Sequence, residues 1–157
     1  LYDCEFRGEG DGVRAIGDGD LEIAYCEFKG LGYGAFLAGM TFVTVYDCLF
    51  ELCSYGIALS STVRATLIGN RMENNYLYGI QVAAVPFDVS HGPLVLVANV
   101  IRNSSQWGIS FCTNSYPFEL TFEGDLKGFG NIIEGRNGYG PLCPTDYEWP
   151  EGFLENE

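Results

Sequence analysis

Residues 67–80 read LIGNRMENNYLYGI, and two positions in this stretch repeat along the whole chain. The first is Asn70, which is followed two positions later by the apolar Met72. The second is Gly79, which stands between Tyr78 and Ile80. Residues equivalent to Asn70 recur every 22 positions in the first half of the chain, and then after 29 and 32: Cys4, Cys26, Cys48, Asn70, Asn99 and Asn131. Residues equivalent to Gly79 follow them by eight or nine positions: Gly12, Gly34, Gly56, Gly79, Gly108 and Gly140.

Apolar residues alternate with other residues around both anchors, which indicates β-strands rather than helices. They stand five and three positions before the Asn or Cys, two positions after it, and one and three positions after the Gly. Each repeat therefore predicts three short strands separated by turns. Short strands that recur in register at this spacing are typical of a parallel β-helix, in which each repeat is one coil and equivalent side chains stack in ladders.

The pattern also resembles a known family. The residues that carry the resemblance are the Asn with its apolar neighbours and the aromatic residue before the Gly, as in Leu67-Ile68-Gly69-Asn70-Arg71-Met72 and Tyr78-Gly79-Ile80. They are similar to the repeat of the pectin-lyase-like superfamily of right-handed parallel β-helix proteins. The resemblance covers nearly the whole chain and implies an all-β, right-handed parallel β-helix solenoid of about six coils with a C-terminal capping segment. The superfamily includes lyases, hydrolases, epimerases and structural modules, so the fold does not by itself imply an activity.

We expect the coils to occupy residues 1–143 and a C-terminal cap or tail to occupy residues 144–157, within a single domain. Leu1 and Tyr2 enter in the middle of a coil, and the uncovered end of a β-helix is an edge prone to aggregation. We therefore expect upstream coils of a longer chain, or a protein partner, to cover this end.

The charge of the chain restricts its partners. It has 8 Lys and Arg against 21 Asp and Glu, which gives a formal net charge of −13. This disfavours nucleic acid, whose phosphates are bound by basic side chains. It also repels polyanionic polysaccharides unless a metal ion intervenes, so neutral or cationic glycans are the better candidates. No apolar stretch reaches the roughly 18 residues that a membrane span requires. The superfamily resemblance implies an extracytoplasmic location, whether secreted, periplasmic or at the cell surface.

Three of the six cysteines, Cys4, Cys26 and Cys48, occupy the position that Asn fills in later repeats. We expect a stack of free thiols in the core, because the parallel Cα–Cβ bonds of stacked residues disfavour a disulfide. A bridge within this stack is one alternative, and a bridge between Cys112 and Cys143 is conceivable as well.

Catalytic residues are best sought where insertions interrupt the repeat. The first insertion, residues 83–93, contains Asp88 and His91, the only histidine of the chain. The second begins at residue 112 and contains Tyr116 and Glu119. Both follow the Gly-anchored strand of adjacent coils, so a cleft between them is the predicted site. Asp88 or His91 would act there as a general base towards a sugar, with Glu119 as a further candidate. The alternative is an exposed loop whose histidine caps a turn.

The outward positions of the Gly-anchored strand argue against two classes of enzyme. These positions carry no Asp or Glu: Arg14, Phe36, Ala58, Gln81 and Ser110. Glycoside hydrolases need paired carboxylates, and enzymes similar to pectate lyase need a group of calcium-binding Asp residues.

Two other features could bind a ligand. Aromatic residues could stack on sugar rings, five from before the anchoring Gly and one from the second insertion: Tyr33, Tyr55, Tyr78, Trp107, Tyr139 and Tyr116. The alternative for the row of five is a ladder that shields a corner of the solenoid and maintains the register. Asp18, Asp20 and Glu22 offer oxygen atoms at alternate positions and could bind Ca²⁺, although Gly-Asp turns are ordinary at solenoid corners. We expect no other cofactor.

These observations predict a non-catalytic extracytoplasmic module with a structural or interaction role in a larger surface or secreted assembly. The alternative is a polysaccharide-active enzyme of the lyase or glycoside hydrolase type, or a glycan-binding module.

Overall fold

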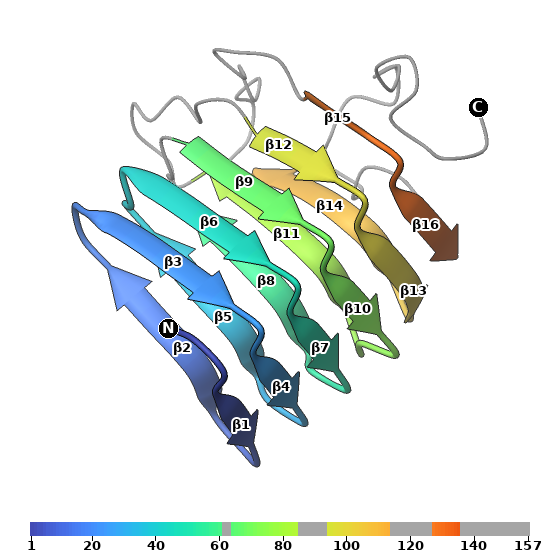
Figure 1. The fold of residues 1–157 in the computed structure, drawn as a ribbon. Helices are drawn as coiled ribbons and strands as arrows, with labels where there is room; N and C mark the ends of the chain where they lie inside the picture. The colour runs from blue at the N-terminus through green and yellow to red at the C-terminus, as the bar shows by residue number, and fades with distance from the viewer. Residues whose placement is uncertain (61–63, 85–93, 114–126, 136–157) are drawn as a thin grey trace.

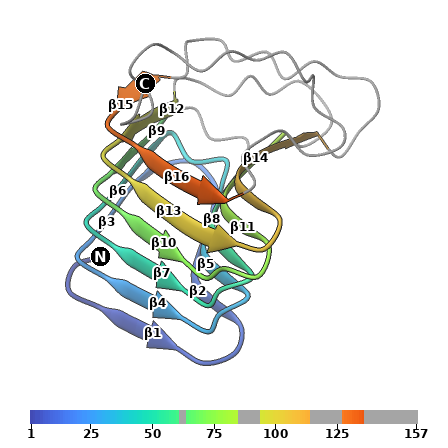
Figure 2. The same ribbon diagram turned by 90° about the vertical axis from the view of Figure 1, so that its right-hand side faces the viewer.

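The computed structural model describes residues 1–60, 64–84, 94–113 and 127–135. These residues form sixteen strands, which wind into a solenoid, and contain no helix (Figure 1). Nothing in this part of the chain could therefore cross a membrane as a long apolar helix. Successive strands enter three different sheets in turn, so that every third strand returns to the same sheet (Figure 2).

All strand pairs in the three sheets are parallel. Sheet A contains β3 (Asp20–Ala24), β6 (Phe42–Tyr46), β9 (Arg64–Ile68), β12 (Leu94–Val97) and β15 (Lys127–Phe129). Sheet B contains β1 (Glu5–Arg7), β4 (Glu27–Lys29), β7 (Leu49–Glu51), β10 (Arg71–Glu73), β13 (Val100–Ser104) and β16 (Ile132–Gly135). Sheet C contains β2 (Asp11–Ile16), β5 (Tyr33–Ala38), β8 (Tyr55–Ser60), β11 (Tyr78–Ala84) and β14 (Trp107–Thr113).

The described strands amount to five complete coils and the first strand of a sixth, somewhat fewer than the six coils expected. The difference arises after β16, because the strand expected beside Gly140 lies outside the described residues, as does the cap expected at residues 144–157.

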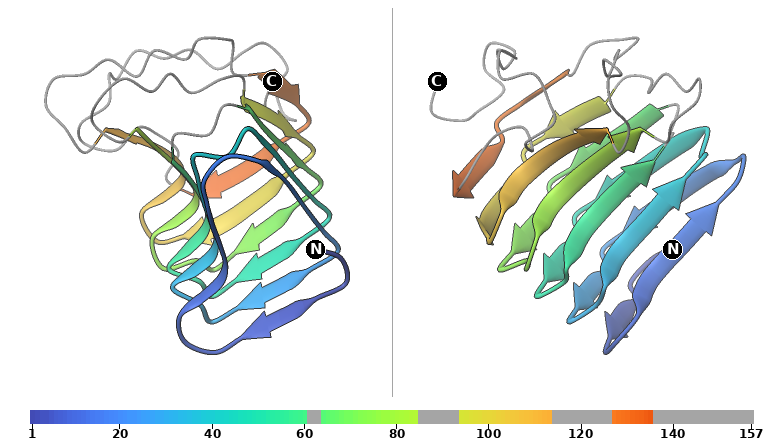
Figure 3. Two further views of the ribbon diagram at one scale, coloured as in Figure 1. Left: turned by 90° about the vertical axis from the view of Figure 1, so that its left-hand side faces the viewer. Right: turned by 180° about the vertical axis from the view of Figure 1, so that it is seen from behind.

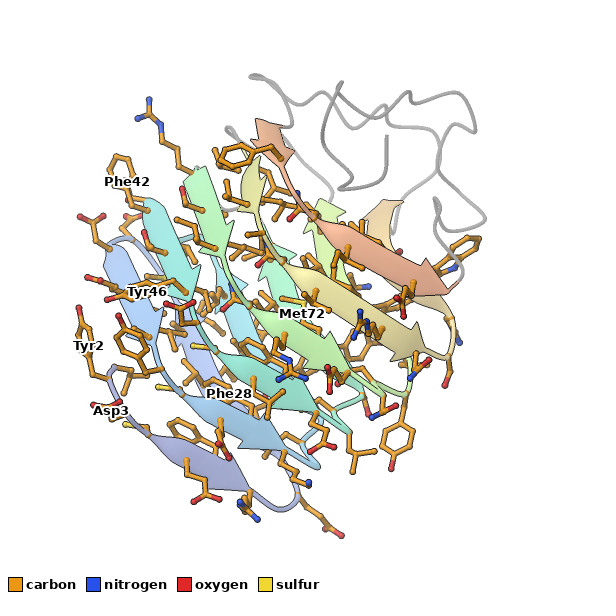
Figure 4. All side chains as sticks on the ribbon, turned by 45° about the vertical axis from the view of Figure 1, so that its right-hand side comes forward. Tyr2, Asp3, Phe28, Phe42, Tyr46 and Met72 are labelled. Carbon is orange, nitrogen blue, oxygen red and sulfur yellow. The ribbon has the colours of Figure 1, made fainter. Side chains whose placement is uncertain are left out.

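The pairing register is the one that the repeat predicts. Phe28 pairs with Phe6 on one side and with Phe50 on the other, and the three rings stack at centroid distances of 4.9 and 4.6 Å. Met72 follows Phe50 in the same inward row. Figure 4 shows Phe28 and Met72 inside the solenoid, and both are fully buried. The alternation of apolar residues thus places one side chain from each coil in every inward ladder.

The turn from sheet A to sheet B is held by the ladder of Cys and Asn side chains. The backbone N–H of Cys26 donates to Sγ of Cys48 (3.4 Å), and the backbone N–H of Cys48 donates to Oδ1 of Asn70 (3.1 Å). In the same way, the backbone N–H of Asn70 donates to Oδ1 of Asn99 (3.1 Å), and the backbone N–H of Asn99 donates to Oδ1 of Asn131 (3.0 Å). Each side chain accepts the amide hydrogen of the neighbouring coil, so a thiol can replace a carboxamide without changing the path of the backbone.

Four cysteines are free thiols in the structure: Cys4, Cys26, Cys48 and Cys53. The predicted stack of free thiols is therefore confirmed, and no bridge forms within it. The alternative bridge between Cys112 and Cys143 involves side chains outside the described part of the chain.

The first coil has a neighbour on one side only (Figure 3). Its inward side chains Phe6, Val13 and Leu21 are only partly buried, whereas the corresponding Phe28 and Ala35 of the second coil are fully buried. Apolar surface that later coils bury is thus accessible at this end of the solenoid.

Candidate functional site

The aromatic row predicted to bind sugars runs across sheet C, at the first residue of each of the strands β5, β8, β11 and β14. The rings of Tyr33 and Tyr55 stack on each other, with centroids 4.5 Å apart and planes within 10°. Tyr78 follows at 5.4 Å with its plane tilted by 42°, and Phe36 contacts Tyr33 edge to face. Each stacked ring covers a face of its neighbour, which leaves less ring surface for a sugar. This geometry favours the interpretation that the ladder shields a corner of the solenoid and maintains the register. Trp107 continues the row by pairing with Tyr78, and sugar binding along it stays a prediction.

The outward row of sheet C has the register that was expected, but two of its five side chains are buried. Ala58 is 3% exposed and Ser110 is 0% exposed, although both belong to this row. At the first coil, the Arg14 guanidinium forms an ion pair with Asp11 (2.7 Å) and lies 4.5 Å from the centre of the Phe36 ring. The described part of this row therefore offers no pair of free carboxylates.

The predicted catalytic cleft falls outside the described residues, and so do its candidates Asp88, His91, Tyr116 and Glu119, together with Tyr139. Their catalytic and stacking roles stay predictions.

The calcium candidates lie at the start of sheet A. Asp20 and Glu22 are exposed on the outward face of β3, and Asp18 is exposed in the preceding turn. Within the described part of the chain, no group of three His, Cys, Asp or Glu side chains is close enough to hold a metal ion. Calcium binding stays a prediction that this geometry does not favour.

A cluster that the sequence did not single out lies on the outward face of sheet A. It consists of Tyr2, Tyr25, Tyr46 and Glu22, and we call it the tyrosine cluster. Ala24, on the outward face of β3, bridges Tyr2 on one side and pairs with Tyr46 on the other. Ala24 itself is 0% exposed, because its two tyrosine neighbours extend past its small side chain. Figure 4 shows Tyr2 and Tyr46 on the same side of the solenoid.

The hydroxyl groups of the cluster are joined by hydrogen bonds. The Glu22 carboxylate raises the pKa of Tyr2 above its ordinary value by accepting a hydrogen bond from the Tyr2 hydroxyl. Loss of solvation raises the pKa of Tyr46, with hydrogen bonds to Tyr2 and Glu22 adding to the effect. These contacts connect β3 and β6 to the residues that precede β1, and they hold the two phenols as neutral donors beside a carboxylate.

The rings of the cluster do not stack in one direction. Tyr25 meets Tyr46 edge to face, with centroids 5.2 Å apart and planes at 85°. Tyr2 and Tyr25 are each 53% exposed, and Phe42 at the other end of β6 is 44% exposed. Unlike the row on sheet C, these aromatic side chains present much of their surface to solvent.

The chain was compared with known families and proteins. A family model described as a right-handed β-helix region matches residues 1–144. This chain belongs to the right-handed β-helix family. No curated protein and no solved structure matches it.

In this member of the right-handed β-helix family, the ladders explain most of the recurring residues, and the tyrosine cluster is what they leave unexplained. The one feature of the sequence that could have indicated the tyrosine cluster is the residue at position 25. The equivalent position in the other described coils carries Asp3, Asp47, Gly69, Ala98 or Gly130, all with positive φ. A tyrosine at this position, with φ of 55°, is neither small nor suited to a left-handed backbone.

Proposed function

We propose that this chain is a non-catalytic extracytoplasmic β-helix module with a binding role in a larger surface or secreted assembly. The observation that carries the proposal is the outward row of sheet C. Its described side chains include no carboxylate, and its central position, Ala58, is 3% exposed. Glycoside hydrolysis needs two carboxylates facing the same substrate, and this row supplies none.

The state of the thiols supports the same conclusion. Burial raises the pKa of Cys48 to about 11, and it also raises the pKa of Cys53. A nucleophilic cysteine must be a thiolate near neutral pH, so neither residue is suited to covalent catalysis. Both side chains instead have a structural role, because they continue ladders that Asn70 and Asn75 occupy in the next coil.

The uncovered first coil supports a role within an assembly. Phe6, Val13 and Leu21 belong to inward rows, yet they are only partly buried. A further coil of a longer chain, or a protein partner, would bury this surface and pair the free edges of β1 and β2. The extracytoplasmic location is part of the proposal and rests on the resemblance to the pectin-lyase-like superfamily.

The test is incubation of the purified chain with neutral, acidic and amino polysaccharides, with and without Ca²⁺. Mass spectrometry reports any soluble products, and tyrosine and tryptophan fluorescence reports binding. We expect no products from any substrate. Products that disappear in Asp88→Ala or His91→Ala would overturn the proposal and establish an enzyme with its site at the inserted loops.

A further inference from the structure

The tyrosine cluster has the features of a ligand site, and we propose that it binds a cationic amino-sugar polysaccharide. The inference rests on the proposed binding role and specifies its place and ligand. The ligand would bind on the outward face of sheet A, over its first strands β3 and β6. This place differs from the aromatic row of sheet C and from the insertions that the sequence analysis considered.

The first argument is the accessibility of the rings. Tyr2 and Tyr25 expose about half of their surface, and Tyr25 stands perpendicular to Tyr46. The Tyr2 and Tyr46 hydroxyls lie beside the Glu22 carboxylate, so polar groups border the exposed rings. An exposed aromatic ring is a good stacking surface for the apolar face of a sugar.

The second argument is that the fold does not need a tyrosine at residue 25. The position requires a positive φ, which Gly69 provides without strain in a later coil and which costs a tyrosine roughly 1 kcal/mol. The contact of its ring with Tyr46 offsets part of this cost. A side chain that the ladder could replace by glycine, and that lies half exposed beside two other tyrosines, is better explained by a ligand than by stability.

The third argument is charge complementarity. On sheet B, acidic side chains lie beside basic ones: Lys29 contacts Glu51 and Arg71 contacts Glu73, each at 2.6 Å. Among the described residues, no Lys or Arg side chain forms an ion pair with the Glu22 carboxylate, and the Leu1 ammonium donates to the backbone carbonyl of Glu22 (2.8 Å). The guanidinium of Arg64, also on sheet A, lies instead over the Phe42 ring. An ammonium group could contact the exposed Tyr25 face and the Glu22 carboxylate together.

The fourth argument favours a sugar over a simple amine. Glu22 pairs with Thr44, and Thr44 pairs with Thr66, so a row of polar side chains runs along the solenoid axis. The neighbouring row on sheet A contains Tyr46 and the 39% exposed Ile68. A polar row beside an apolar one matches a chain of sugar rings, which have apolar faces and hydroxyl groups at their edges.

Calorimetric titration with a glucosamine tetrasaccharide tests the proposal, alongside its N-acetylated form, an uncharged glucan tetrasaccharide and tetralysine. We expect the glucosamine tetrasaccharide to bind most tightly. Tyr25→Gly should weaken its binding about tenfold, through the loss of one stacking and cation–π contact. Its unfolding midpoint should stay close to that of the original chain, because glycine relieves the positive φ. Glu22→Gln should also weaken binding.

Two control variants separate this site from general attraction to an acidic protein. Tyr76→Ala removes a tyrosine that is 58% exposed away from the cluster, and Glu9→Gln removes an exposed charge in the first coil. Both should bind like the original chain.

Equal binding of tetralysine, unchanged binding in Tyr25→Gly, or no binding by the folded chain would each overturn the proposed site. Shortened oligosaccharides in the mass spectrum would instead overturn the non-catalytic role, so the two failures are distinguishable.

Discussion

Replacing Asn99 by alanine should destabilise the solenoid more than replacing a cysteine in the same ladder of Cys and Asn. Oδ1 of Asn99 accepts hydrogen bonds from the backbone and side-chain nitrogens of Asn70, at 3.1 and 3.0 Å. Its Nδ2 donates to the Leu67 carbonyl (2.8 Å) and to Oδ1 of Asn131 (3.1 Å). The residue is 1% exposed, so water cannot replace these partners. At about 1 kcal/mol net for each of four bonds, the loss is about 4 kcal/mol.

Urea unfolding monitored by circular dichroism measures this effect. With a dependence of about 2 kcal/mol per molar urea, the midpoint should fall by about 2 M. Cys26→Ala is the matched control, because Cys26 occupies the same position but its thiol forms only two weak hydrogen bonds: it donates to the Ala24 carbonyl (3.1 Å) and accepts from the backbone N–H of Cys4 (3.4 Å). We expect it to cost about 1 kcal/mol. If Asn99→Ala proves too unstable to fold, Asn99→Cys should recover part of the loss. A cost for Asn99→Ala no larger than that for Cys26→Ala would refute the reasoning.

Three further predictions concern other parts of the structure. Gly34→Ala should cost about 1–3 kcal/mol, measured by the same urea titration, because its new Cβ would lie 2.6 Å from the carbonyl oxygen of Gly56 in the next coil; unchanged stability would contradict this packing. At pH 8, iodoacetamide should modify the half-buried Cys4 well before Cys48, whose pKa is raised to about 11, and denaturant should remove the difference. Equal rates in the folded protein would contradict the ladder position of Cys48. The raised pKa of Tyr46 contributes stability that is fully present below pH 10 and is lost as the pH rises above it, so Tyr46→Phe should flatten the stability profile at alkaline pH, measured by chemical denaturation.

The fold was predictable because its determinants recur. Phe28 and Phe50 are 22 positions apart and pair directly, and the same is true of Cys26 and Cys48. In a solenoid of constant coil length, sequence spacing translates directly into spatial contact, so the register follows without any knowledge of the turns. The coil count was less certain, because later coils are longer and their insertions have no counterpart in the first three.

The tyrosine cluster was not singled out by the same reasoning, because its side chains do not recur from coil to coil. Tyr25 occupies a position that holds Asp, Gly or Ala in other coils, and Tyr2 precedes the first complete repeat. Tyr2, Ala24 and Tyr46 are 22 positions apart, so the repeat spacing accounts for their bridge and pairing. What the spacing did not indicate is that Glu22, considered as a calcium ligand together with Asp18 and Asp20, lies beside the Tyr2 hydroxyl. The row that begins at Tyr33 attracted attention because it repeats, and repetition in a solenoid indicates packing.

The one-sided packing of the first coil also bears on the dynamics of the molecule. In a stack in which each coil contacts only its neighbours, a coil that is covered on one side only has half the contacts of an inner one, and it should open first as long as no further coil or partner covers it. Amide hydrogen exchange should therefore be fastest in β1 and β2 and slow progressively towards β8. Tyr2 and Tyr46 lie two layers apart, on either side of Ala24. A ligand that contacts both would tie the frayed layer to the ordered ones, and its affinity would be reduced by the cost of closing that end.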